Sequence, residues 1–333
     1  MNPAPPPPRL APPPVLASRR SPLARVQTEA VAAALREAWP GLEPAFLWQR
    51  STGDRVLDRP LADVGGKGLF VKELDAAVCS GAAAAAVHSL KDVPTRLAPG
   101  LVIAATPRRA PVEDVLLCGA GAAGFSALPA GATLGTSSPR RAAQALRANP
   151  RLRVVLLRGN VGSRRAAVGL GEPGDGSPTR CDATVLARAG LERLGVSVEA
   201  PGHAVLPPEE SLPAAGQGAV AVVCREDDAA TRERLAPLDD PPTAAAVAAE
   251  RALVHRLGAD CHSPVAVLAA PEAAPGSPGR WRLRARVLST DGRRCLAAER
   301  TCDAGRLMAA AEDAAAELLG AGAAALLAEA ASA

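Results

Sequence analysis

The sequence predicts an α/β fold followed by a smaller α+β unit. From residue 15 to about residue 235, short apolar segments alternate with helical segments, which is typical of largely parallel sheets. The last third instead has the order helix, antiparallel strands, helix, which indicates a separate unit. With 333 residues, 48% of them hydrophobic, the chain can bury several cores.

The composition excludes several classes of protein. The net charge of +4, from 38 basic and 34 acidic residues, is too small to indicate a nucleic-acid partner. No apolar run reaches the ~18 to 20 residues of a membrane helix, and the proline-rich start has no signal-peptide pattern. Seven cysteines without a CxxC pair argue against disulfides or a zinc ribbon. We therefore expect a cytoplasmic protein with reduced thiols, no membrane or nucleic-acid partner and no metal.

The elements of the first two thirds follow from local signals. Residues 1–14 form a proline-rich tail that is expected to be disordered and extended. A strand at 15–17 precedes a helix that opens at Ser21 and Pro22, because serine is a good N-cap and proline a good first helical residue. Further strands are expected at residues 46–48, 87–89, 101–104, 115–118, 133–135, 154–157, 183–186 and 219–223.

The last third is expected to begin with a helix over 243–257. Strands follow around Val265, at 281–288 and at 295–300, and Asp291 with Gly292 is a typical hairpin turn between the last two. An alanine-rich helix closes the chain. Residues 169–178 are predicted to form an exposed loop.

Residues 138–165 contain eight arginines and no acid. Arg140 and Arg141 fall in the first turn of a predicted helix, where the helix dipole disfavours cations, so we expect a ligand to compensate their charge. Arg158 with Arg164, and Arg19 with Ser21, repeat the arrangement after other strands. Guanidinium groups match carboxylates bidentately, which predicts a polyanionic ligand, carboxylate-rich or phosphorylated. The alternative is a solvated basic face.

Two further positions carry candidate chemistry. Asp92 follows a predicted strand, where open α/β sheets place ligands, and beside Lys91 it is either an ordinary ion pair or a carboxylate that holds N–H donors and moves protons. His88 is expected to be a packed strand residue. Cys261 lies in a short polar loop, where a thiol is exposed enough to react. The glycine-rich segment 65–68 lacks the spacing of a phosphate-binding P-loop.

Several short motifs, taken in order from about residue 15 to the C-terminus, resemble one known family, the porphobilinogen deaminases or hydroxymethylbilane synthases. The motifs are RRSPLA (19–24), PL (60–61), GGKGLFVKE (65–73), VHSLKDVP (87–94), GTSS (135–138) with Arg140 and Arg141, LRGNVG (157–162), LPAAGQG (212–218), and ERA (250–252) before Cys261. The chain departs from the family pattern at Asp63, where many members have lysine, and at Ala84, where an acid is familiar.

The resemblance implies three domains. Two similar α/β domains of the type II periplasmic-binding-protein kind would enclose a cleft, the first formed by residues 15–108 and 216–236 and the second by 109–215. A small α+β domain, residues 240–333, would carry the cofactor-attachment cysteine.

The resemblance also implies a transferase of tetrapyrrole and heme biosynthesis. Cys261 would hold a dipyrromethane cofactor through a thioether. Four porphobilinogen molecules would be added head to tail with loss of ammonia, and water would release hydroxymethylbilane. Asp92 would be the catalytic carboxylate, and a monomer is expected. The residues implied in binding acetate and propionate groups, or in covering the cleft, are Arg19, Ser21, Lys67, Phe70, Lys91, Ser138, Arg140, Arg141, Arg158, Arg164, Arg193 and Gln217.

Two other functions compete with this interpretation. A solute-binding or effector-sensing module of the same architecture would need the arginines but would have no use for Cys261 or Asp92. A phosphate-transfer enzyme is disfavoured because the sequence has neither a Walker lysine nor paired metal-binding acids.

Overall fold

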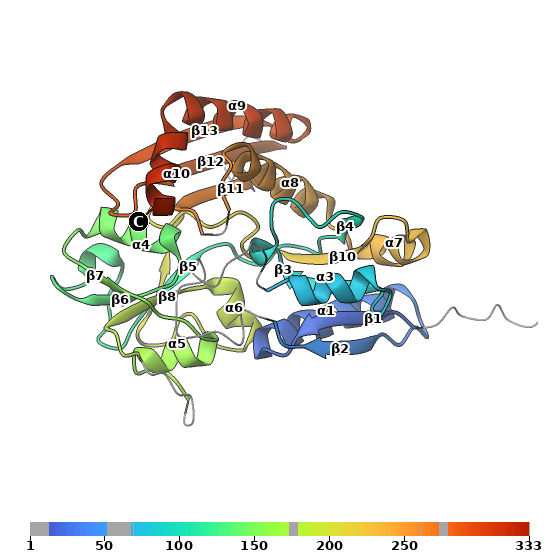
Figure 1. Ribbon diagram of the computed structural model, residues 1–333. Helices are drawn as coiled ribbons and strands as arrows, with labels where there is room; N and C mark the ends of the chain where they lie inside the picture. Colours follow the sequence, from blue (N-terminus) through green and yellow to red (C-terminus); the bar gives the residue numbers. More distant parts are fainter. Residues whose placement is uncertain are drawn as a thin grey trace, which may run out of the picture.

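Three sheets organise the chain, and each carries its own helices (Figure 1). The structure, a computed structural model, describes residues 13–51, 68, 70–172, 179–260, 262–272 and 279–332. Lys67 and Cys261 therefore lie outside the described residues. In Figure 1 the first sheet lies at the lower right, the second at the lower left, and the third above the junction between them.

The first sheet has the strand order β2-β1-β3-β10-β4. Strands β1, β2 and β3 are mutually parallel, whereas β10 runs antiparallel to both β3 and β4. Helices cover both faces, because Leu35 of α1 packs on one side of the sheet and Leu74 of α3 on the other. The elements are β1 (Val15–Arg19), α1 (Pro22–Ala38), β2 (Ala45–Gln49), α3 (Lys72–Cys79), β3 (Ala85–Ser89), β4 (Leu101–Ala105), β10 (Val220–Arg225) and α7 (Ala229–Leu235).

The second sheet, with order β7-β6-β8-β5-β9, repeats the plan of the first. Three parallel strands, β7, β6 and β8, lie beside the antiparallel β5, which in turn pairs with β9. Each sheet thus places its antiparallel strand second from one edge. This duplication confirms the predicted pair of similar α/β units. The elements are β5 (Asp114–Cys118), β6 (Thr133–Gly135), α4 (Pro139–Ala148), β7 (Arg153–Val155), α5 (Val161–Ala167), β8 (Ala183–Ala187), α6 (Arg188–Arg193) and β9 (His203–Leu206).

Two crossover segments, residues 106–113 and 207–219, join the two sheets. The backbone N–H of Ala110 in the first segment donates to the carbonyl of Gly218 in the second at 3.3 Å. Gly218 has φ +86, and a Cβ there would collide with the backbone of Ala110. The crossover segments therefore approach each other at a distance that only glycine permits.

The third sheet is antiparallel throughout, with order β11-β12-β13. Leu253, Leu283 and Leu318 join its helices and strands into one core, which confirms the predicted α+β unit. None of the described helices could span a membrane by itself, although the bent pair Ala304–Gly320 and Ala323–Ser332 has the length and composition when both are counted together. The elements are α8 (Pro241–Arg256), β11 (Val265–Pro271), β12 (Arg280–Leu288), β13 (Cys295–Asp303), α9 (Leu307–Gly320) and α10 (Ala323–Ser332).

Most local predictions hold, and three differ from the structure. Ser21 caps α1 as predicted, its hydroxyl accepting from the N–H of Ala24. The strand predicted at 154–157 is β7, which ends two residues earlier and exposes Leu156. Strand β9 was not predicted, because it is a short edge strand with little burial. Pro14, assigned to the tail, is buried, and its carbonyl accepts from Ala45 at 3.0 Å, so the sheet extends one residue further.

Candidate active site

The turn that carries Lys91 and Asp92 lies at the carboxyl end of β3. Residues Leu90–Asp92 form a single 3₁₀ turn, and the N–H of Leu90 donates to the carbonyl of Ala219 at 3.0 Å. The buried Leu90 side chain fills the space above Gly216, where φ is +68 and a Cβ would collide with Leu90. The second crossover segment thereby fixes Asp92 beside the junction of the two sheets.

Arg140 and Arg141 begin helix α4 on the second sheet and are nearly inaccessible, with 4% and 5% of their surface exposed. Ser138 is the N-cap of this helix, and its hydroxyl accepts from the backbone N–H of Arg141 at 3.5 Å. Nη1 of Arg140 donates to the carbonyl of Leu212 at 2.7 Å, and Nη1 of Arg141 donates to the carbonyl of Val185 at 2.8 Å. Both cations are therefore held inside the protein.

Asp114 is the acid that pairs with both of these arginines. Its carboxylate is fully buried and lies 2.9 Å from Nη1 of Arg140 and 2.6 Å from Nη2 of Arg141. Ser211 and Gln217 each donate a further hydrogen bond to it at 3.0 Å. Burial alone would raise the pKa of Asp114, but the charges of the two arginines outweigh burial and hold its pKa well below the usual range.

Asp114 supplies part of the compensation that the sequence analysis expected from a ligand. It comes from β5, outside the arginine-rich segment, and one carboxylate against two guanidinium groups leaves one positive charge at the pair. Sequence reasoning missed Asp114 as a functional residue. The available signal was an acid placed directly before the buried strand 115–118, where a charge needs a partner.

Arg164 on helix α5 faces the same region. Its Nε donates to the carbonyl of Gly159 at 3.0 Å. Burial, and next the charge of Arg141, lower the pKa of Arg164 to about 10, while the charge of Asp92 opposes this shift and Arg158 adds to it. Arg164 therefore lies within electrostatic reach of Asp92, which belongs to the other sheet.

Lys91 completes the cluster. Burial, and next the charge of Arg141, lower the pKa of Lys91 to about 8, against the opposing attraction of Asp92 and Asp114. A partly buried ammonium among arginines is stabilised by an anionic ligand, because such a ligand supplies the missing negative charge. Asp92 thus lies within electrostatic reach of Lys91 and Arg164, Arg141 acts on the same two cations, and Arg158 acts on Arg164.

The other predicted residues take supporting positions. Arg193 donates to the carbonyl of Gly218 at 2.8 Å, and Gln217 donates to that of Val112 at 2.7 Å, so both contact the crossover segments. The guanidinium of Arg19 lies over the ring of Phe70, 4.4 Å from its centre. His88 is buried, with Nε2 3.6 Å from a carboxylate oxygen of Asp75.

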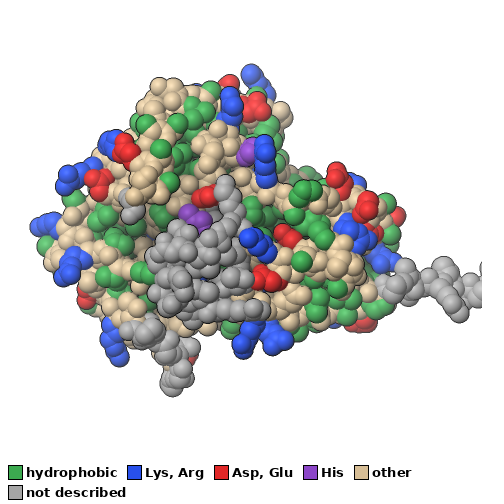
Figure 2. All heavy atoms as spheres, in the orientation of Figure 1, with side chains coloured by type: hydrophobic (Ala, Val, Ile, Leu, Met, Phe, Trp, Pro, Cys, Tyr) green, Lys and Arg blue, Asp and Glu red, His purple; other side chains and the backbone are tan. Residues whose placement is uncertain are grey.

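The solvated-face alternative describes only part of the arginine-rich segment. Arg147, Arg151 and Arg153 are exposed, whereas the other five arginines of the segment are buried or half-buried. On the visible face in Figure 2, basic and acidic side chains are interspersed over the three lobes. The solvated-face interpretation therefore holds for Arg147, Arg151 and Arg153 only.

The family models identify the chain. A model described as "Porphobilinogen deaminase, dipyromethane cofactor binding domain" matches residues 15–233, and one described as "Porphobilinogen deaminase, C-terminal domain" matches residues 244–329. The chain belongs to the porphobilinogen deaminase family.

Curated porphobilinogen deaminases are similar over most of their length. The protein of that name from Ralstonia nicotianae is 47% identical over 285 residues, which cover 86% of this chain and 81% of that protein. The one from Sphingopyxis alaskensis is 49% identical over 282 residues, covering 83% and 84% of the two chains. Cys261 and Lys67, two residues that the porphobilinogen deaminase resemblance singles out, lie outside the described residues.

Solved structures of solute-binding proteins show only a distant likeness. The methionine-binding protein MetQ has a TM-score of 0.41 and 10% identity, covering 67% of this chain and 88% of that chain. The aliphatic sulphonate binding protein SsuA from Escherichia coli has a TM-score of 0.35 and 13% identity, covering 72% and 69%. The architecture assigned to this porphobilinogen deaminase family member therefore rests on its own strand order.

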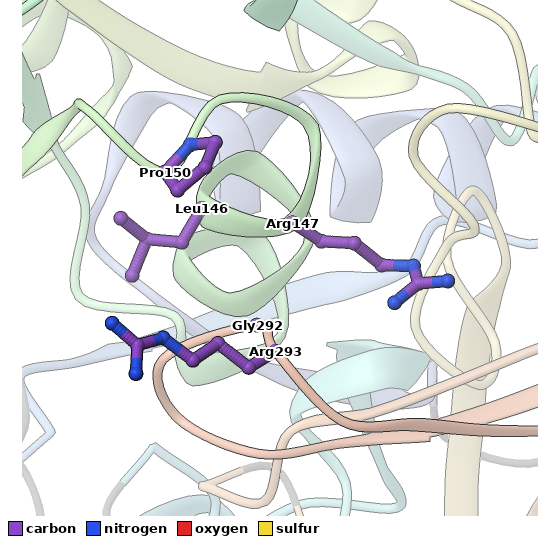
Figure 3. A pocket seen from close by; sticks show the side chains of 5 residues that line it. All are labelled: Leu146, Arg147, Pro150, Gly292 and Arg293. Atoms are coloured by element: carbon purple, nitrogen blue, oxygen red, sulfur yellow. The ribbon is translucent and has the colours of Figure 1, made fainter.

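The described residues offer neither a metal site nor a second obvious ligand site. Among them, no group of three or more His, Cys, Asp and Glu side chains could hold a metal ion. A surface pocket of about 340 Å³ lies where the turn after β12 meets α4 (Figure 3). Its two guanidinium groups, Arg147 and Arg293, point away from each other, and none of the predicted site residues lines it.

Proposed function

We propose that this chain joins four porphobilinogen molecules head to tail, with loss of ammonia, and releases the product, hydroxymethylbilane, by hydrolysis. The proposal rests on membership of the porphobilinogen deaminase family, whose matching model is described as binding a dipyromethane cofactor. One feature of the chain itself supports it: Lys91 and Asp92 of one sheet lie within electrostatic reach of cations of the other, Arg141 acting on Lys91 and Asp92 acting on Arg164. Such a junction suits a ligand that carries several carboxylates.

The residues around the junction fit a dipyrromethane. Burial and then repulsion by Arg141 lower the pKa values of Lys91 and Arg164, so carboxylates placed near them would be stabilised. When bound, the dipyrromethane supplies the free pyrrole position to which the first porphobilinogen is joined. We assign its attachment to the thiol of Cys261. The neighbouring Asp260 accepts from the N–H of His262 at 3.0 Å, so the residues on either side of Cys261 form a tight turn.

We assign the proton chemistry to Asp92. A carboxylate at this position can accept hydrogen bonds from pyrrole N–H groups and stabilise positive charge that develops on a ring when ammonia leaves. Its 3₁₀ turn fixes the backbone that carries the carboxylate, and Lys91 and Arg164 lie within electrostatic reach of it. The same group is placed to accept the proton that leaves the ring when the new carbon–carbon bond forms.

We assign substrate and cofactor carboxylates to a set of cations and donors at the two sheets. Lys91, Arg158 and Arg164 would bind them directly. Arg140 and Arg141 would offer the N–H groups that Asp114 and the carbonyls leave over. The remaining assigned residues are Arg19, Ser21, Lys67, Ser138, Arg193 and Gln217, and Phe70 is assigned to cover the cleft.

We further propose three domains, a monomer and a cytoplasmic location. The sheets support domains at 15–108 with 216–236, 109–215 and 240–333, because each range holds one complete sheet with its helices. The monomer is proposed because the sequence has no coiled-coil pattern and no large apolar stripe, and a large apolar face is the usual mark of an obligate interface.

The intact mass of the purified protein tests the proposed function. We expect an excess equal to one dipyrromethane in the wild type and no excess in Cys261→Ser, because an alcohol cannot replace the thiolate nucleophile. Cys79→Ser is the matched control, since Cys79 is an exposed thiol at the end of α3. A wild-type protein that turns over porphobilinogen at its unmodified mass would contradict the assignment.

The titration of Lys91 predicts how activity depends on pH. Below pH 8 the ammonium is charged and attracts carboxylates, and above pH 8 it loses its proton. We expect kcat/KM, which reports the free enzyme, to fall by up to about tenfold per pH unit above this point. In Lys91→Arg the charge persists, so the fall should be absent. The substrate's own titration is common to both proteins, and an identical pH profile in both would refute the role of Lys91.

A further inference from the structure

Helix α8 packs against the crossover segments and leads along the chain toward Cys261. In Figure 1 it lies along the boundary between the upper lobe and the first sheet. Its residue Glu250 is fully buried and accepts from both terminal nitrogens of Arg109, at 2.7 and 3.0 Å. The backbone N–H groups of Gly216 and Ala269 donate to the same carboxylate at 2.7 and 2.9 Å. Glu250 therefore fastens α8 to both crossover segments and to β11.

The next residue, Arg251, contacts the segment that directly follows Asp92. Its Nη1 donates to the carbonyl of Val93 at 3.0 Å, and its Nη2 donates to those of Pro94 and Thr95 at 2.7 and 3.2 Å. Three consecutive carbonyls thus share one guanidinium. Burial lowers the pKa of Arg251 to about 10, so the group stays charged at neutral pH.

These contacts require the shape of arginine. A guanidinium presents its N–H donors in a rigid planar fork, whereas the ammonium of lysine is a point charge on a flexible stem. The segment 93–95 lies outside any helix or strand and contains a proline, which has no N–H to donate. Arg251 therefore supplies the hydrogen-bond donors that these backbone carbonyls would otherwise find in a helix or a sheet.

A second contact joins the same two parts of the chain one helical turn later. Nε of Arg96 donates to Nε2 of His255 at 3.2 Å, and both side chains are exposed. Residues 251 and 255 lie on one face of α8, because positions four apart are neighbours on a helix. That face of α8 therefore follows the segment 93–96.

We infer that Arg251 is a positioning residue for the reaction: its fork fixes the turn of Asp92 relative to the helix that leads to Cys261. This inference rests on the proposed function, in which the growing chain is attached at Cys261 and the chemistry takes place at Asp92. Helix α8 ends at Arg256, five residues before that cysteine. A displacement of about 1 Å between a substrate and its catalytic group can cost 10²-fold in rate.

Arg251→Lys tests the inference, with Arg256→Ala, an exposed position in the last turn of the same helix, as control. Arg251→Lys keeps the charge and the aliphatic stem but loses the fork. We expect it to fold and to carry the dipyrromethane mass. Its kcat should fall by about 10²-fold with KM within threefold of wild type. Hydrogen exchange at residues 90–96 should accelerate, and Arg256→Ala should match the wild type.

The outcomes separate this inference from the proposed function. Unchanged kcat in Arg251→Lys would overturn the positioning role, and so would a raised KM with normal kcat, which indicates binding instead. Loss of folding or of the mass excess in Arg251→Lys would also overturn it, because Arg251 would then serve stability or cofactor assembly. A wild-type protein without the mass excess or turnover would instead remove the proposed function itself.

Discussion

Asp92→Ala is expected to reduce kcat by at least ~10²-fold, which is the usual scale for loss of a proton-transfer group. The protein should keep its fold. The turn that carries Asp92 is held by backbone bonds of Leu90 and by the carbonyl contacts of Arg251, and neither depends on the carboxylate. Turnover is measured per molecule that carries the dipyrromethane mass, so that a loss of cofactor is not counted as a loss of catalysis.

The matched control for Asp92 is Asp227→Ala. Asp227 pairs with Arg225 at the surface, and its side chain is 86% exposed, so its removal should leave kcat unchanged. Asp92→Asn keeps the size of the side chain and removes only the charge, and it should lose nearly as much activity as the alanine variant. If Asp92→Ala turned over within twofold of Asp227→Ala, a different group would have to perform the proton chemistry.

Asp114→Asn is expected to lower the free energy of unfolding by about 3–5 kcal/mol, because it leaves two buried guanidinium groups without their counter-charge. The amide still fills the space, so the loss reports charge and not packing. Arg140 and Arg141 should also lose their orientation, which raises KM for porphobilinogen. Urea unfolding measures the change in the free energy of unfolding, and steady-state kinetics without denaturant measures the change in KM.

Ser211→Ala is the control for Asp114→Asn. It removes one hydrogen bond from a hydroxyl to the same carboxylate and keeps the ion pairs, so we expect a loss of about 1.5–3 kcal/mol and a normal KM. Equal destabilisation by the two substitutions would show that the charge of Asp114 contributes nothing beyond one hydrogen bond, and Asp114 would then not act as the counter-charge of the two arginines.

Local chemistry made much of the architecture predictable. Ser21 followed by Pro22 indicated the start of α1, and the alternation of apolar and helical segments indicated largely parallel α/β sheets, because these signals act over a few residues. The division into two α/β domains was implied by the family resemblance. The position of Asp92 after a strand likewise indicated a ligand-binding turn. In each case the determining residues are neighbours in the sequence.

Long-range pairing was the part that local signals could not supply. Asp114 lies 27 residues before Arg141, and their contact exists only because β5 crosses to the second sheet and lies beside β8. Nothing near Arg251 in the sequence indicates that it contacts residues 93–95, more than 150 positions away. Family resemblance could name the binding residues, but their internal partners depend on the strand order.

The placement of β10 between β3 and β4 has a consequence for synthesis of the chain. Strand β4 reaches its neighbours only through Val220–Arg225, so the first sheet stays split until that segment has left the ribosome. The whole second α/β unit is made in the interval. The first α/β unit is therefore the first to begin translation and the last of the two to close.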